Sequence, residues 1–266
     1  MKQNRRLILF ATSENPDPYI NAICYGVLHK DVKSIEVVAI ADHSYAGSDY
    51  EPGKERAHYV LSKILAQLQG LSEGGYWPFK AGEGVQFQEN LDDPTAKDLY
   101  KTVLESINRG GVSATTISFG ELFARLRQWG SSGAVVFDVT ALQKNLLVDV
   151  VSSSLLLDFA EVYSFELRKA HVTHDQDDLF HKLKPERDFV YRNLLQSAPV
   201  EQASRRIKRW KIQLRAYFVL AALVFVMPFI LAIIWPAEKV AAYIGFFSSL
   251  LTIATALLPF VREKFE

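Results

Sequence analysis

The sequence predicts an α/β fold: a Rossmann-like, mostly parallel sheet with helices on both faces, followed by a C-terminal transmembrane helical hairpin. Short apolar runs alternate with segments of helical spacing along residues 1–198, which is typical of a parallel sheet covered on both faces. Six Lys or Arg residues then fall within positions 205–215, and two uncharged apolar runs follow at 216–235 and 240–261. Each run is long enough to cross a bilayer as a helix.

The first elements are a strand, a helix, a strand and a helix. Residues 5–11 form an apolar run that ends in a turn-rich stretch, and the next residues have apolar positions at helical spacing. A second strand is predicted to end near Asp42. An amphipathic helix follows, and Gly70 predicts its C-terminal end.

The same alternation continues to about residue 169. Asp93 and Pro94 suit the cap and the first position of a helix. The polar residues 175–195 are predicted to form helical pieces that lead into a linker. The remaining elements are predicted as a loop or small hairpin at 74–88, a helix at 93–111, a short strand at 114–120, a helix at 121–129, a buried strand at 132–142, a helix at 143–157 and a last strand at 160–169.

Three regions of different charge follow one another along the chain: an α/β domain at 1–198, a basic juxtamembrane linker helix at 199–213 and a hairpin at 214–262. The first 200 residues hold 21 Lys and Arg against 26 Asp and Glu. This acidic balance argues against sequence-specific binding of duplex DNA, which needs clustered cations.

The single cysteine, Cys24, lies among apolar residues, which predicts a core thiol in a reducing compartment.

The hairpin is predicted to place the protein in the inner membrane as a multi-pass protein. The basic residues before the first run should stay on the cytoplasmic side, so both termini are expected in the cytoplasm. The N-terminus has too short an apolar core for a signal peptide. The second run carries small and weakly polar residues at helical spacing, and this stripe is either a packing face or the lining of an oligomeric pore. Its residues are Gly245, Ser248, Ser249, Thr252, Thr255 and Ala256.

Polar residues follow several predicted strands, and ligands bind beyond the carboxyl ends of parallel strands. Hydroxyls, amides and a lysine there suit phosphate or ribose, so the chain is expected to need no cofactor but to bind a nucleotide ligand. The alternative is that these residues are turn formers and helix caps. No glycine-rich fingerprint of the dinucleotide or P-loop type is present. The candidate ligand-binding residues are Thr12, Ser13, Asn15, Asp42, Asp138, Thr140 and Lys144.

Two further patterns concern metal binding and catalysis. The spacing of the histidines and aspartates at 171–181 matches no zinc signature, so no metal site is expected; these residues are His171, His174, Asp175, Asp177, Asp178 and His181. Glu14, Glu166 or Asp138 would suit glycosidic-bond chemistry, so a membrane-tethered enzyme that cleaves nucleotides or NAD stays open as an alternative. A passive tether for a partner is the third possibility.

The strand, threonine loop and helix at 135–157 resemble those of CRISPR-associated Rossmann-like sensor domains, which bind cyclic oligoadenylates. Those domains carry a glycine-rich turn where this chain has Ala141, Leu142 and Gln143 before Lys144. The whole layout also resembles that of two-helix membrane effectors of bacterial antiphage systems, including those attached to retrons. The resemblance implies self-association, restraint by a reverse transcriptase with its RNA and DNA product or control by a cyclic oligonucleotide, and membrane damage on release.

Overall fold

The computed structural model divides the chain into two compact units, Met1–Ser204 and Arg205–Glu266. We call the first unit the head. The second is described by itself because the positions of the parts relative to one another are not determined. The structure describes residues 5–41, 56–78, 89–91, 93–130, 134–157, 159, 161–168, 178–234, 241, 245–246, 248–249 and 252.

The head contains a six-stranded, mostly parallel sheet with the order β5-β2-β1-β6-β7-β8. All neighbouring strands are parallel except β7 and β8, which pair antiparallel. The order of the five parallel strands is that of a doubly wound sheet, which changes direction between β1 and β6. The strands are β1 (Arg5–Phe10), β2 (Val32–Ile40), β5 (Val112–Ile117), β6 (Val135–Asp138), β7 (Val162–Leu167) and β8 (Phe189–Asn193).

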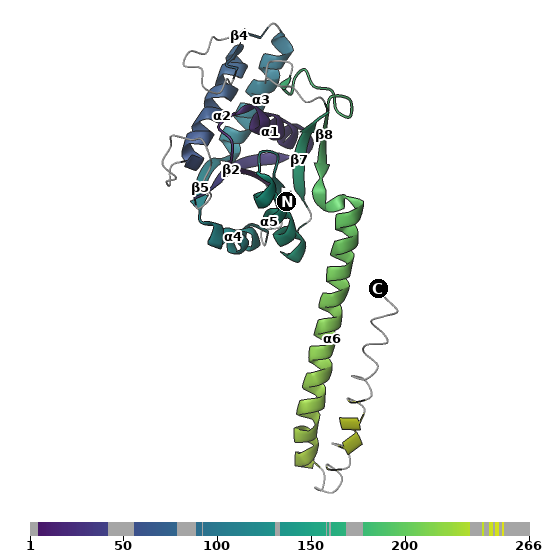
Figure 1. Cartoon of the computed structure of the whole chain (residues 1–266). Helices are drawn as coiled ribbons and strands as arrows, with labels where there is room; N and C mark the ends of the chain where they lie inside the picture. The colour runs from purple at the N-terminus through teal and green to yellow at the C-terminus, as the bar shows by residue number, and fades with distance from the viewer. Residues whose placement is uncertain are drawn as a thin grey trace. The chain divides into compact units, whose positions relative to one another are not determined.

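Helices cover both faces of this sheet, as predicted (Figure 1). Side chains alternate along β1, so that Leu7 and Leu9 pack in one core while Ile8 and Phe10 pack in the other. The first core is closed by α1 (Asp17–His29), α2 (Arg56–Glu73) and α3 (Pro94–Gly110), and the second by α4 (Leu122–Gly130) and α5 (Lys144–Leu157). The short helix η1 (Phe119–Glu121) precedes α4 and has no buried residue. Cys24 is fully buried in the first core, which confirms its predicted place.

Most predicted elements of the head are confirmed, including the cap of α3, where the side chain of Asp93 accepts a hydrogen bond from the Thr95 amide at 2.8 Å. The small hairpin is present as the antiparallel strands β3 (Gly75–Tyr76) and β4 (Glu89–Asn90). The predicted end of α2 at Gly70 is wrong. The helix continues to Glu73 and stops before Gly74, whose φ of 96° a residue with a Cβ rarely adopts.

The prediction of helical pieces at 175–195 is wrong for the part that forms β8. Phe189, Tyr191 and Asn193 are buried there, while Arg192 between them is exposed. This alternation has the period of a strand, and the strand pairs with β7 from Tyr163–Asn193 to Leu167–Phe189. The sheet therefore ends in an antiparallel edge strand, and the predicted last strand at 160–169 is the last but one.

A single long helix, α6 (Ala198–Ile234), runs from the last residues of the head into the second unit. It contains the predicted linker helix and most of the first predicted span. Counting only the residues described with their side chains, no helix is long and apolar enough to cross a membrane. Most of the second predicted span lies outside the described residues.

Candidate functional site

The candidate site lies where the carboxyl ends of β1 and β6 meet. These two strands are parallel neighbours, and Leu9 is in register with Asp138. The β1–α1 loop and the β6–α5 loop therefore leave the sheet side by side, at the point where the strand order changes direction. Ligands of doubly wound sheets bind at this point. Of the predicted ligand-binding residues, all but Asp42 belong to these two loops, to the last residue of β6 or to the first turn of α5.

The β1–α1 loop is held by the buried phenol of Tyr19 from the first turn of α1. Its hydroxyl accepts hydrogen bonds from the amides of Thr12 and Ser13, at 3.1 and 3.0 Å, and donates one to the Ser13 carbonyl at 3.0 Å. The backbone N–H groups that would cradle a phosphate are thus occupied by a side chain of the protein itself. The loop has a fixed shape as a result.

Thr12 joins the two loops, because its hydroxyl donates a hydrogen bond to the carbonyl of Ala141. Ser13 and Asn15 act within their own loop. The Ser13 hydroxyl accepts from the Asn15 amide at 3.1 Å, and the Asn15 side chain accepts from the Asp17 amide at 3.0 Å. Both are local side-chain turns, so the turn-forming role is observed for these two residues, and their role toward a ligand stays a prediction.

Asp138 is buried and accepts three hydrogen bonds. Thr140 donates two of them, from its amide and its hydroxyl, both at 3.0 Å, and the Tyr191 hydroxyl donates the third at 2.8 Å. The Thr140 hydroxyl in turn accepts from the Phe165 amide at 2.8 Å. Burial raises the pKa of Asp138 to about 6, against the opposing effect of the bonds from Tyr191 and Thr140. Asp138 and Thr140 therefore connect the end of β6 to β7 and β8.

Among the described residues, three cations lie at these loops, and sequence reasoning found only Lys144, which is exposed at the first residue of α5. Arg56 donates to the Thr12 carbonyl at 3.3 Å, and Lys63 bonds the Glu14 carboxylate at 3.3 Å. Burial would lower the pKa of Lys63, but Tyr59 and Glu14 outweigh it and raise that pKa. Both missed cations come from α2, and no pattern in its sequence indicates that they reach the β1–α1 loop.

Other predicted residues lie away from this junction or outside the described part of the chain. Glu166 on β7 is paired with Arg192 on β8 at 2.8 Å. Asp42 is outside the described residues, as are four members of the histidine and aspartate cluster, namely His171, His174, Asp175 and Asp177. Among the residues that the structure describes, no group of three or more His, Cys, Asp or Glu side chains could hold a metal ion.

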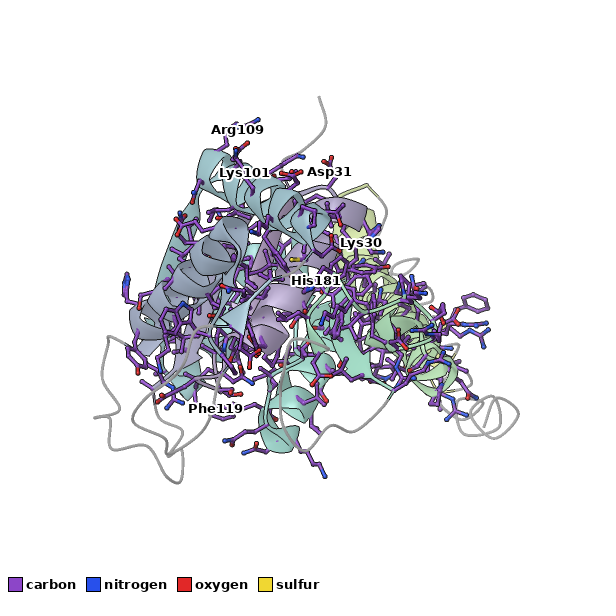
Figure 2. All side chains as sticks on the ribbon, turned by 90° about the horizontal axis from the view of Figure 1, so that it is seen from above. Lys30, Asp31, Lys101, Arg109, Phe119 and His181 are labelled. Atoms are coloured by element: carbon purple, nitrogen blue, oxygen red, sulfur yellow. The ribbon has the colours of Figure 1, made fainter. Side chains whose placement is uncertain are left out.

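The two described members of that cluster join a polar network inside the head. The Asn21 side chain donates to the carbonyl of Asp178 at 2.8 Å, and His181 Nδ1 lies 2.9 Å from the Tyr100 hydroxyl. In Figure 2, His181 lies toward the centre of the head, while Lys101 on α3 lies at its outer edge. This network connects α1 and α3 to the segment before β8, so its evident role is structural.

Replacing Tyr19 with phenylalanine is expected to lower the free energy of unfolding by about 1–2 kcal/mol. The change removes a hydroxyl that bonds three backbone groups, and water can replace part of these bonds in a partly exposed loop. Denaturant titration of the full chain in detergent measures the loss. Tyr25→Phe on the same helix is the control, because that ring packs on Tyr191 and His29. Equal stability of the two variants would contradict the role of Tyr19.

The site as a whole holds hydroxyls and cations beside a buried carboxyl group, and the hydroxyls of Thr12, Ser13 and Thr140 are bonded within the protein. The three carboxylates considered for glycosidic chemistry are all engaged: Asp138 with Tyr191 and Thr140, Glu14 with Lys63 and Glu166 with Arg192. Binding of a phosphate or ribose at these two loops stays a prediction. No protein-family model, curated protein or solved structure matches the chain.

Proposed function

We propose that this chain is a membrane-anchored effector of bacterial antiphage defence. The head senses a nucleotide signal, or is restrained by a partner complex such as a reverse transcriptase with its RNA and DNA product. On release, the spans at 216–235 and 240–261 assemble between chains and permeabilise the inner membrane. One hairpin encloses no channel, so several chains must associate. The Rossmann-like character of the head and the transmembrane hairpin are parts of this proposal.

The observation that carries the proposal is the continuity of α6. It is one helix from Ala198 to Ile234, and along it the sequence passes from the end of the head through six basic residues into an uncharged run. A basic stretch followed by about 20 uncharged apolar residues in one helix is typical of a cytoplasmic entry into a membrane. Neither proposed span contains Asp, Glu, Lys, Arg or His.

The stripe of the second span supports a role within lipid. Ser249 donates to the carbonyl of Gly245 and Thr252 to that of Ser248, both at 2.9 Å. A hydroxyl bonded to the carbonyl one turn earlier is satisfied within its own helix, so it tolerates a medium without water. The same hydroxyls can turn toward water when helices associate, which is what a weakly polar pore face requires. Thr255 lies outside the described residues.

The head supports a sensing role better than a catalytic one. The ends of β1 and β6 form a preorganised junction in which the hydroxyl of Thr12 bridges the two loops. Arg56 and Lys144 supply positive charge near that junction. A ligand that bound there would affect the membrane spans only if it bound two states of the protein with different affinities. A nucleotide with several phosphates fits the charge of the site.

The test is depolarisation of bacteria that express the free protein, measured with a potential-sensitive dye. We expect the unmodified chain to depolarise the cells and a variant with leucine at Ser248, Ser249, Thr252 and Thr255 to lose this effect. Ala254→Leu is the matched control, because nine residues from Gly245 place it on the opposite side of a helix. Both variants must be recovered from the membrane fraction in equal amounts.

Two outcomes would remove the proposal. Depolarisation that persists in the fourfold leucine variant would exclude a pore lined by the stripe. Retained defence after both spans are replaced by unrelated spans would show a passive tether. Release of a free base when the full chain is incubated with nucleotides or NAD would instead favour the glycosidase alternative.

A further inference from the structure

The segment of α6 that precedes the proposed first span has two chemically different sides. Ile207, Trp210 and Leu214 follow one another at spacings of three and four residues, so they share one side of the helix. Trp210 is 62% exposed and Leu214 40%. The basic residues share the rest of the circumference with Gln213 and with Ile212, which is 66% exposed, and all of them except Lys211 are exposed; they are Arg205, Arg206, Lys208, Arg209, Lys211 and Arg215.

The spacing along the helix fixes how far each charge lies from the apolar run. At about 1.5 Å per residue, Arg215 is about 2 Å and Lys211 about 8 Å from Ala216 along the axis. Arg205 and Arg206 are about 15 Å or more away. The headgroup layer of a bilayer adds only about 5–8 Å on each side of its hydrocarbon core. A helix along the bilayer normal thus places its last two basic residues among the phosphates.

We propose that residues 205–215 of α6 form a binding surface for anionic phospholipid headgroups, with Lys211 and Arg215 as its principal contacts. This inference rests on the membrane anchoring of the proposed function and adds a lipid specificity to it. Clusters of four to eight basic residues directly on the cytoplasmic side of a span bind anionic lipids electrostatically. Arg215 suits a phosphate because its guanidinium presents paired donors.

Two features favour a lipid headgroup over a nucleic acid as the partner. The basic residues share the helix with an apolar side that includes Trp210, a residue type enriched at the membrane interface. Binding to a nucleic acid would not bury that apolar side, whereas an interfacial helix segment buries it at the headgroup boundary. The cluster also ends at Arg215, directly before the uncharged run.

The test measures which lipid the full chain retains. Purified protein in a mild detergent is mixed with equal amounts of phosphatidylglycerol and phosphatidylcholine, separated from free micelles, and its retained lipids are counted. We expect an excess of phosphatidylglycerol that falls about fivefold for each proximal charge removed, so that the K211Q/R215Q variant loses most of it. The distal R205Q/R206Q variant is the matched control and should lose less than about threefold, because screening at 0.15 M salt acts over about 8 Å.

The outcomes separate the lipid surface from the anchoring on which it rests. A chain that floats with pure phosphatidylcholine vesicles but retains both lipids equally overturns the lipid surface and leaves the anchoring intact. A chain that fails to float overturns the anchoring and the lipid surface together. Tight binding of a 30-nucleotide poly(U) RNA that is lost in K211Q/R215Q, with equal retention of the two lipids, overturns the lipid surface in favour of a nucleic acid.

Discussion

Gly110→Ala is expected to lower the free energy of unfolding of the head by about 3 kcal/mol, one of the two largest effects predicted for this chain. Gly110 is the last residue of α3, and a Cβ atom there would lie well inside the van der Waals contact distance to the Lys33 carbonyl oxygen of β2. That obstacle is backbone within the central sheet, so it cannot rotate away as a side chain does. Either α3 or the start of β2 must shift.

Thermal unfolding of the full chain in detergent, followed by near-ultraviolet circular dichroism, measures this effect. For a unit of about 200 residues the loss corresponds to a decrease of about 6–12 °C in Tm. Gly120→Ala is the control, because a Cβ at Gly120 meets no atom within 4 Å, and we expect it to change stability by less than about 0.5 kcal/mol. Equal melting of the two variants would mean that α3 does not end against β2.

The alternation of strands and helices in the head was predictable because each element carries its own signal. A buried parallel strand such as β1 is apolar on both faces, and α3 has both a capping aspartate and a proline at its start. Antiparallel β8 was missed because its polar flanks suggested a helix, although the alternation of Phe189, Tyr191 and Asn193 with Val190 and Arg192 has the period of a strand. The polar composition around this segment favoured a helix, although the period of its buried residues indicated a strand.

The place of the candidate site was also predictable, because the rule for doubly wound sheets depends only on strand order. The side chains that bond the site residues within the protein were not predictable. Tyr19 holds the β1–α1 loop and Tyr191 holds Asp138 from a strand 53 residues away. Such contacts depend on which elements pack side by side, and no spacing in the sequence encodes them. Sequence patterns therefore find residues able to bind a ligand but not those already bonded within the protein.

Asp138→Asn is expected to make the head more stable, relative to the unmodified chain, as the pH rises. Burial raises the pKa of Asp138 in the folded head to about 6, whereas an aspartate in an unfolded chain titrates near 3.9. The neutral carboxyl group contributes its full stability below about pH 3.9, and this contribution is lost as the pH rises through about 6. The difference corresponds to about 2.5 kcal/mol between pH 4 and pH 8.

Comparison with the unmodified chain at each pH isolates Asp138, because every other titrating group is common to both proteins. The unfolding free energies of the two proteins at pH 4, 5, 6, 7 and 8 should therefore diverge mainly between pH 4 and pH 7.

Tyr191→Phe tests the same site by removing a hydrogen-bond donor to Asp138. It removes the 2.8 Å bond to the carboxylate, and bonds to a charged acceptor are stronger than bonds to a neutral one, so this variant should lose more stability at pH 8 than at pH 4. Parallel pH profiles for all three proteins would show that Asp138 has the same pKa in the folded head as in the unfolded chain, and would contradict the raised pKa of this buried carboxyl group.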